Sequence, residues 1–156
     1  MNSKILRVQL LALLEGGNAH ITTKQALADF PLDYINTRAN GIPYSLWELM
    51  EHMRIAQYDI LDFIRNPNYK ERKWPDEYWP SAGKKADETD WKSTIKNFED
   101  DLETLKEMVK NPETDFTGPI PHIPDYTILR EILLVADHNA YHTGQIIAIR
   151  RALNIY

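Results

Sequence analysis

The chain has 156 residues, of which 43% are hydrophobic and 26% are charged, and it contains no cysteine. This length and composition predict one globular domain over residues 1–156, and the absence of cysteine excludes disulfides, thiolate metal ligands and a cysteine nucleophile. The net charge is −5, and residues 86–115 hold ten acidic residues against four lysines. Because an acidic surface repels phosphate backbones, we expect no nucleic-acid partner and interpret this segment as a solvated helix face.

The N-terminal segment predicts an amphipathic helix over residues 3–15, which two glycines end. Its apolar start is similar to a secretion signal, but Arg7, Gln9 and Glu15 interrupt the apolar run, and no small-residue cleavage site follows. No apolar run approaches the ~18 residues of a membrane span. We therefore expect a cytoplasmic protein without a membrane partner.

A capping box marks the next helix. Thr22 with Gln25 predicts the start of a short helix, which Pro31 limits. Asparagine, glycine and proline then indicate a loop over residues 36–43.

A second capping box, Ser45 with Glu48, predicts a long helix that runs to about Arg65, where an Asn-Pro pair stops it. A long connection follows over residues 66–83 and contains three prolines. Disordered linkers hold few aromatic residues, so we expect this connection to be ordered and packed against the body. Its aromatic residues are Tyr69, Trp74, Tyr78 and Trp79.

Two more long helices complete the predicted fold. Residues 89–110 place apolar side chains at helical spacing, residues 112–124 read as a proline-rich ordered loop, and a last helix runs from about Thr127 to Leu153. Strand-type alternation is scarce. The pattern therefore predicts an all-α fold, a four-helix bundle with long ordered loops and crossover connections.

Three of the five histidines lie on predicted inner helix faces. His138 and His142 are four residues apart on the last helix, so both rings lie on one face. That face also carries Leu134, Val135, Ile146 and Ile149. His52 shares the apolar side of the second long helix. His20 and His122 fall on predicted loops, where no spacing assigns them a role.

Buried imidazoles need polar partners, because an unsatisfied ring costs about 1–3 kcal/mol. One divalent cation bound by His52, His138 and His142 would satisfy all three, and would leave a coordination position for water or substrate. The alternative is three core histidines hydrogen-bonded to tyrosine, aspartate or backbone groups. The spacing is not that of a zincin, because Asn139 follows the first histidine of the pair, nor that of a di-iron carboxylate bundle, which needs paired Glu-x-x-His motifs.

Two distant segments resemble the DinB-like superfamily of metal-dependent enzymes: residues 45–52 (SLWELMEH) and 138–145 (HNAYHTGQ). The resemblance covers most of the chain and implies a bundle in up-down-down-up order, often a homodimer. It also implies a divalent ion, either zinc, nickel or iron, held by the three histidines. Similar proteins include S-transferases and isomerases that use a low-molecular-weight thiol such as bacillithiol or mycothiol. The chain departs from the pattern at Thr143, where many members carry arginine, which puts an anion-binding role of this position in doubt.

The resemblance and the histidines lead to three functional hypotheses, of which the two enzymatic ones act on a small-molecule substrate. In the first, the metal ion favours the thiolate of a co-substrate thiol, which attacks an electrophilic carbon. In the second, a metal-bound water hydrolyses a substrate, and Asp59 and Asp137 are the nearest candidate bases in the sequence. In the third, the protein binds metal without catalysis.

Five further side chains are candidates for the surroundings of the metal. Gln145 lies three residues after His142 and could fix an imidazole by a hydrogen bond, or could pack at a helix crossing. Trp74 and Trp79, with Tyr78 between them, could line the substrate pocket or only cover helix surface. Tyr141 could line the same pocket or belong to the core.

Overall fold

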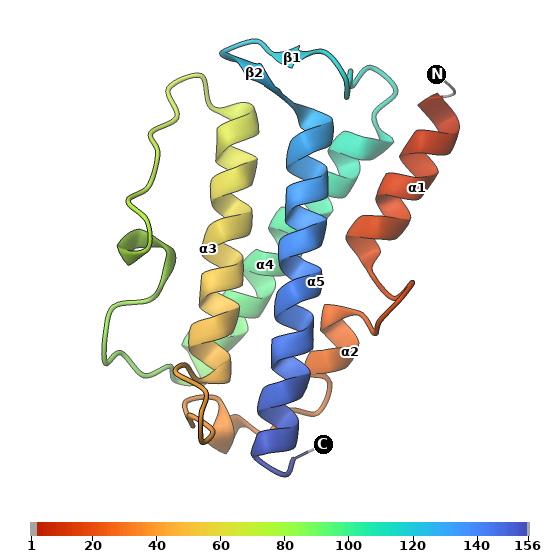
Figure 1. Ribbon diagram of the computed structural model, residues 1–156. Helices are drawn as coiled ribbons and strands as arrows, with labels where there is room; N and C mark the ends of the chain where they lie inside the picture. The colour runs from red at the N-terminus through yellow and green to blue at the C-terminus, as the bar shows by residue number, and fades with distance from the viewer. Residues whose placement is uncertain (1–2, 156) are drawn as a thin grey trace.

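The structure is a computed structural model that describes residues 3–155. Its four main helices are α1 (Ser3–Glu15), α3 (Leu46–Arg65), α4 (Glu88–Lys110) and α5 (Ile128–Ala152). Helices α3 and α4 run in one direction, and α1 and α5 run in the opposite one (Figure 1). Helix α3 packs against both α4 and α5, and α1 packs against the same two helices. The predicted four-helix bundle is confirmed, and its helix directions follow the up-down-down-up order.

The capping boxes begin helices where the sequence predicts them. The Ser45 hydroxyl accepts from the Glu48 N–H at 3.3 Å, and the Glu48 carboxylate accepts from the Ser45 N–H at 2.7 Å. This reciprocal pair satisfies two of the N–H groups that lack a partner inside the helix. Thr22 and Gln25 form the same arrangement at the start of α2 (Thr23–Leu27), a short helix that packs on α5. Helix α4 begins at Glu88, one residue before the predicted start, because Asp87 caps it.

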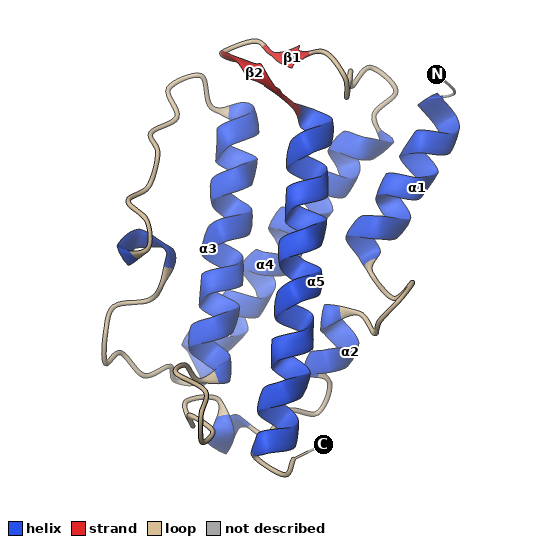
Figure 2. Cartoon of the chain, in the orientation of Figure 1, coloured by secondary structure: helices blue, strands red, loops and turns tan. Residues whose placement is uncertain are grey.

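The proline-rich segment before α5, which is predicted as a loop, contains a hairpin. Strand β1 (Pro119–Ile120) pairs antiparallel with β2 (Ile123–Thr127) (Figure 2). A residue that precedes proline is driven out of the helical region, and both Ile120 and Ile123 precede prolines, so this segment is held extended. Two single-turn 3-10 helices also form outside the predicted helices: η1 (Leu32–Tyr34), before the predicted loop, and η2 (Asp76–Tyr78), inside the predicted connection.

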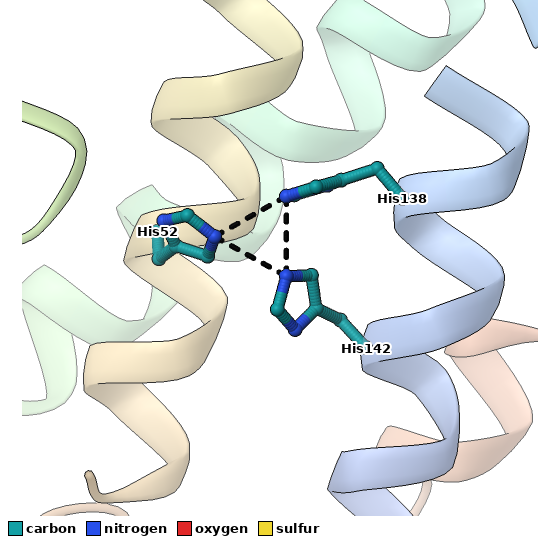
Figure 3. Close-up of side chains that lie close together, drawn as sticks. All are labelled: His52, His138 and His142. Carbon is teal, nitrogen blue, oxygen red and sulfur yellow. Dashed lines mark hydrogen bonds between the residues drawn. The ribbon is translucent and has the colours of Figure 1, made fainter. Parts of the chain in front are cut away.

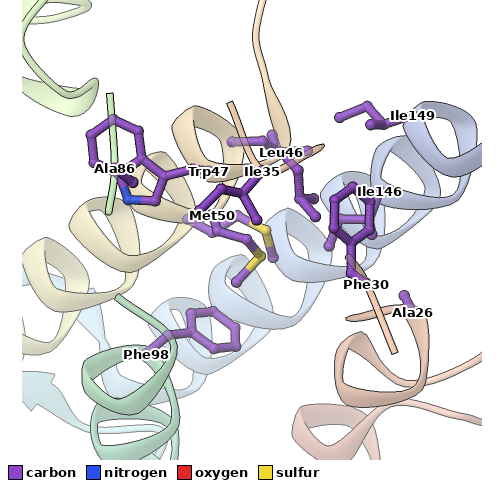
Figure 4. Close-up of a cluster of buried hydrophobic side chains, with 12 residues drawn as sticks. Ala26, Phe30, Ile35, Leu46, Trp47, Met50, Ala86, Phe98, Ile146 and Ile149 are labelled. Carbon is purple, nitrogen blue, oxygen red and sulfur yellow. The ribbon is translucent and has the colours of Figure 1, made fainter. Parts of the chain in front are cut away.

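Two clusters of buried apolar side chains fill the bundle. One lies where α3 meets α2, α4 and the C-terminal half of α5 (Figure 4). The other lies toward the opposite end and joins α1 to α3, α4 and α5. Among residues 3–155, no helix is long and apolar enough to cross a membrane. The acidic residues of α4 such as Glu99, Asp100 and Glu107 are exposed.

The chain returns from the end of α3 to the start of α4 through residues 66–87, here called the crossover segment. It runs along the outside of the bundle beside α3 (Figure 1). Between residues 66 and 85 no residue is buried, and Trp74 is 68% exposed. The connection is therefore ordered as predicted, but only a few contacts, most of them polar, pack it against the bundle.

Candidate metal centre

Helices α3 and α5 lie side by side and direct three imidazoles toward one point (Figure 3). His52 comes from the middle of α3, and His138 and His142 come from successive turns of α5. His52 and His142 are 3% and 6% exposed, and His138 is partly buried. The helical spacing that places the histidines on inner faces thus brings all three together.

Behind the histidines, a chain of amides ties three helices together. The Asn139 amide donates to Gln57 Oε1 at 2.9 Å, and the Gln57 amide donates to the Phe98 carbonyl at 2.7 Å. These bonds join α5 to α3 and α3 to α4 inside the bundle. They hold the two histidine-bearing helices at a constant separation, which a site shared between helices requires.

The three Nε2 atoms are nearly equidistant. His52 Nε2 lies 3.2 Å from the Nε2 atoms of both His138 and His142, and those two atoms are 3.1 Å apart. A divalent ion about 2.1 Å from three imidazole nitrogens separates them by about 3.0 Å in octahedral geometry and by about 3.4 Å in tetrahedral geometry. The observed spacing falls between these two values, so the group has the dimensions to hold one metal ion.

The hydrogen bonds made by the Nδ1 atoms determine which ring nitrogens carry the lone pairs. His52 Nδ1 lies 2.8 Å from the Tyr78 carbonyl, and His142 Nδ1 lies 2.6 Å from Gln145 Oε1. A carbonyl oxygen only accepts, so each Nδ1 carries the proton and donates it. In a neutral imidazole this leaves Nε2 as a lone pair, which is the form that binds a metal.

Burial keeps these rings neutral. It lowers the pKa of His52 and of His142, and it lowers the pKa of His138 to about 3, with further lowering from the two neighbouring imidazoles. Nitrogen lone pairs that face one another at this distance repel unless a cation or a shared proton lies between them. The donor set therefore fits a divalent cation, and three imidazoles suit zinc, nickel and iron.

A pocket of about 650 Å³ adjoins the three histidines. All four predicted lining residues, Trp74, Tyr78, Trp79 and Tyr141, line it, and Tyr44 lines it as well. The Trp79 ring stacks on the His52 imidazole with centroids 4.2 Å apart and planes 8° apart. The aromatic wall thus begins directly at one of the candidate ligands.

Comparison with known proteins shows which family the chain belongs to. Residues 19–146 match the model of the DinB superfamily, and the matched range includes all three histidines. The chain belongs to the DinB superfamily. No curated protein and no solved structure matches the chain.

This DinB protein has one carboxylate in the lining of its pocket, within the residues that the structure describes: Asp59. Asp59 is buried and accepts from the Tyr78 hydroxyl at 2.6 Å and from the Tyr69 hydroxyl at 3.2 Å, while Arg72 Nε lies 3.4 Å away. Burial and the nearby Asp59 raise the pKa of Tyr69 to about 12, and they raise that of Tyr78 as well, so both phenols remain donors. Asp137, the other candidate base, is exposed and does not line the pocket.

Other positions that the sequence analysis singles out lie apart from the centre. His20 Nδ1 bonds to the Ile21 carbonyl, and His122 Nε2 bonds to the Phe63 carbonyl. Thr143 is buried, and its hydroxyl bonds to the Asn139 carbonyl and to Thr23. Thr143 does not line the histidine pocket, so it offers no anion-binding group there.

Two contributors to the site were not identified from the sequence. Tyr44 lines the pocket and stacks on Trp79, with ring centroids 5.3 Å apart. The other contributor is the backbone carbonyl of Tyr78, which orients His52. Tyr44 stands directly before the Ser45 cap, and this position could have indicated that its ring lies near the start of the helix. Nothing in the sequence indicates which backbone carbonyl accepts a hydrogen bond from a histidine.

Proposed function

We propose that this DinB protein is a metal-dependent enzyme that transfers a low-molecular-weight thiol to an electrophilic small molecule. His52, His138 and His142 are the proposed ligands of one zinc, nickel or iron ion. The observation that carries the proposal is the convergence of three Nε2 atoms, 3.1–3.2 Å apart, at the wall of an aromatic pocket.

A metal ion held by His52, His138 and His142 would have a coordination position free for a further ligand from the pocket. When bound there, a divalent cation lowers the pKa of a thiol, so that the thiolate exists at neutral pH. In such a transfer the thiol proton would leave to solvent and the thiolate sulfur would form a bond to the electrophilic carbon. The leaving group would depart with the electron pair of the bond that breaks.

The protein's own groups orient this chemistry. Gln145 and the Tyr78 carbonyl keep the protons of His142 and His52 on Nδ1, which directs both Nε2 atoms to the centre. Trp79 and Tyr44 form a stacked wall against which an apolar electrophile can pack. Tyr141 is 66% exposed and stands at the mouth of the pocket.

The state of Asp59 favours thiol transfer over hydrolysis. A hydrolase needs a general base within hydrogen-bond reach of the attacking water. The oxygens of Asp59 already accept from two phenols and face Arg72. A thiol depends less on such a base than water does, because the pKa of a free thiol is about 8.5, whereas that of water is about 15.7.

Elemental analysis of protein purified without an affinity tag tests the metal site. We expect about one divalent ion per wild-type chain and none in His142→Ala. Incubation with small thiols and monochlorobimane tests the reaction, with chelator-treated protein as the control. Equal rates before and after chelation would overturn metal catalysis, and turnover of an ester without thiol would favour the hydrolase.

The homodimeric state and the cytoplasmic location stay predictions. Light scattering coupled to gel filtration checks the first of them: a homodimer has twice the mass of the 18.2 kDa chain.

A further inference from the structure

Tyr78 of the crossover segment contacts helix α3 at two points. Its backbone carbonyl accepts from His52 Nδ1 at 2.8 Å, and its hydroxyl donates to Asp59 Oδ2 at 2.6 Å. Asp59 lies seven residues after His52 on the same helix, which is about 10 Å along the axis and nearly the same face. The side chain and the backbone of one residue therefore bridge a candidate ligand and a buried carboxylate.

Asp59 gathers its partners from a single part of the chain. Tyr69, Arg72 and Tyr78 all belong to the crossover segment, and all three approach the Asp59 carboxylate. Asp59 itself is only 7% exposed. A buried carboxylate with three donors from one segment is a strong local attachment, because charge-assisted hydrogen bonds are about twice as strong as neutral ones.

The crossover segment has few other means of attachment near the centre. No residue between 66 and 85 is buried, and in this part of the segment Trp79 packs against a core cluster as a partly buried side chain. The end next to α4 is held separately, by Asn36 bonds to both backbone groups of Ala86 at 2.8 Å. Between the two ends, the contacts with α3 include the Asp59 cluster, the hydrogen bond from His52 to the Tyr78 carbonyl and the stacking of Trp79 on His52. The Phe63–Tyr69 ring contact and the Lys84 ammonium over the Trp47 ring add to them.

We propose that Asp59 is a positioning residue for the metal centre: it holds Tyr78 so that the Tyr78 carbonyl keeps the His52 proton on Nδ1 and His52 Nε2 toward the ion. The proposal rests on the proposed metal site. It assigns to Asp59 a role through Tyr78 and His52, without contact with the ion or the substrate. If so, the contacts between Asp59 and the crossover segment determine both the wall of the pocket and the affinity for metal.

Two tyrosine variants make a matched pair for the test. Tyr78→Phe removes the hydroxyl at 2.6 Å from Asp59 and retains the backbone carbonyl. Tyr69→Phe removes a hydroxyl that donates to the same carboxylate. It retains the contact between the ring at position 69 and Phe63, whose centroids are 5.1 Å apart. Only Tyr78 contacts His52 through its carbonyl. Asp59→Asn completes the set with a side chain of equal size.

Zinc affinity, measured by competition with a chromophoric chelator, is the first readout. Loss of a group that orients a metal ligand costs 10–100-fold in affinity as a general magnitude. We expect Asp59→Asn and Tyr78→Phe to fall in this range and Tyr69→Phe to lose less than either. Wild-type affinity in both Asp59→Asn and Tyr78→Phe overturns the proposal. A loss in Asp59→Asn with none in Tyr78→Phe also overturns it, because Asp59 would then act without Tyr78.

The tautomer of His52 in metal-free protein is the second readout, and it does not depend on metal binding. Long-range proton–nitrogen NMR spectra distinguish Nδ1–H from Nε2–H imidazoles. We expect a single Nδ1–H form of His52 in wild type and in Tyr69→Phe, and a mixture in Tyr78→Phe and Asp59→Asn. An unchanged single form in all variants overturns the positioning role. A wild type that binds no metal contradicts the proposed function, while the tautomer spectra still decide whether Asp59 positions His52.

Discussion

The two sides of the histidine pocket are built in different ways. On one side, His138 and His142 stand on α5, whose inner residues Val135, Ile146 and Ile149 are buried in the two core clusters. On the other side, the crossover segment has no buried residue from 66 to 85 and attaches through Asp59, Phe63 and His52 on α3. The difference shows a division of roles: the helices determine where the ring nitrogens lie, and the segment determines the orientation of one ring and the shape of the pocket.

The largest expected effect comes from a substitution among the histidines that the helices position. His52→Ala removes one of three candidate ligands, and we expect zinc affinity to fall by more than about 100-fold, beyond the range for a group that only orients a ligand. Calorimetric titration with zinc measures the change. His20→Ala is the matched control, because His20 is exposed and lies outside the cluster. Equal affinity in His52→Ala and His20→Ala would show that the cluster does not bind the ion.

The next effect concerns the orienting group that α5 itself supplies. Gln145→Leu removes the acceptor that lies 2.6 Å from His142 Nδ1. We expect a 10–100-fold loss of zinc affinity with little change in the far-ultraviolet circular dichroism spectrum. Gln145→Glu keeps an acceptor at this position and should recover most of the loss. If Leu and Glu behave alike, Gln145 acts only by packing.

The pH dependence of metal-free protein tests the burial of the three rings. Burial lowers the pKa of all three, whereas in the unfolded chain they titrate near 6.5. Below that pH the unfolded state binds protons that the folded state does not, so the free energy of unfolding falls as pH falls from 6.5 toward 5. Each ring contributes at most about 1.4 kcal/mol per pH unit.

Urea unfolding at several pH values measures this slope. In His138→Leu one of the three contributions is absent, so the decline between pH 6.5 and 5 should be shallower than in wild type. His20→Ala, with an exposed ring, should follow the wild-type curve. An equal slope in wild type and His138→Leu would mean that burial does not depress the pKa of His138.

The smallest expected effect changes the stability of the bundle and leaves the affinity for metal unchanged. Ser45→Ala removes the hydroxyl that caps α3, and we expect the free energy of unfolding to fall by about 1 kcal/mol. Zinc affinity should stay at its wild-type value, because the cap lies nearly two turns before His52 on the helix. A large loss of affinity in this variant would mean that the helical side is less rigid than its packing indicates.

Most of the helical side could be predicted from the sequence, because its signals are local. Capping boxes at Thr22 and Ser45 begin α2 and α3 as predicted, and the four-residue spacing places His138 and His142 on one inner face. Gln145 lies within one turn of His142, so its contact is also a local one. The two-residue strand β1 is too short for alternation to reveal it.

The segment side could be predicted only in part. Its aromatic content indicated order and placed Trp74 and Trp79 at the pocket, but its path along α3 depends on the partners of Asp59, which are 10 to 19 residues away in the sequence. The acceptor for His52 is a backbone carbonyl, and every residue has one. Side-chain identity therefore could not indicate that Tyr78 orients the ring.

The parallel course of α3 and α4 has a consequence for how such proteins diversify. Helix α3 has 20 residues and is about 30 Å long, so a chain that begins α4 in the same direction must first travel back over that whole length. In this protein three residues of the return path, Trp74, Tyr78 and Trp79, line the pocket beside the histidines. Insertions or exchanges in this stretch could remodel the chamber and its choice of small molecule while the three imidazoles keep their places. The bundle's topology thus places a long connection, with no buried residue from 66 to 85, directly beside the three histidines.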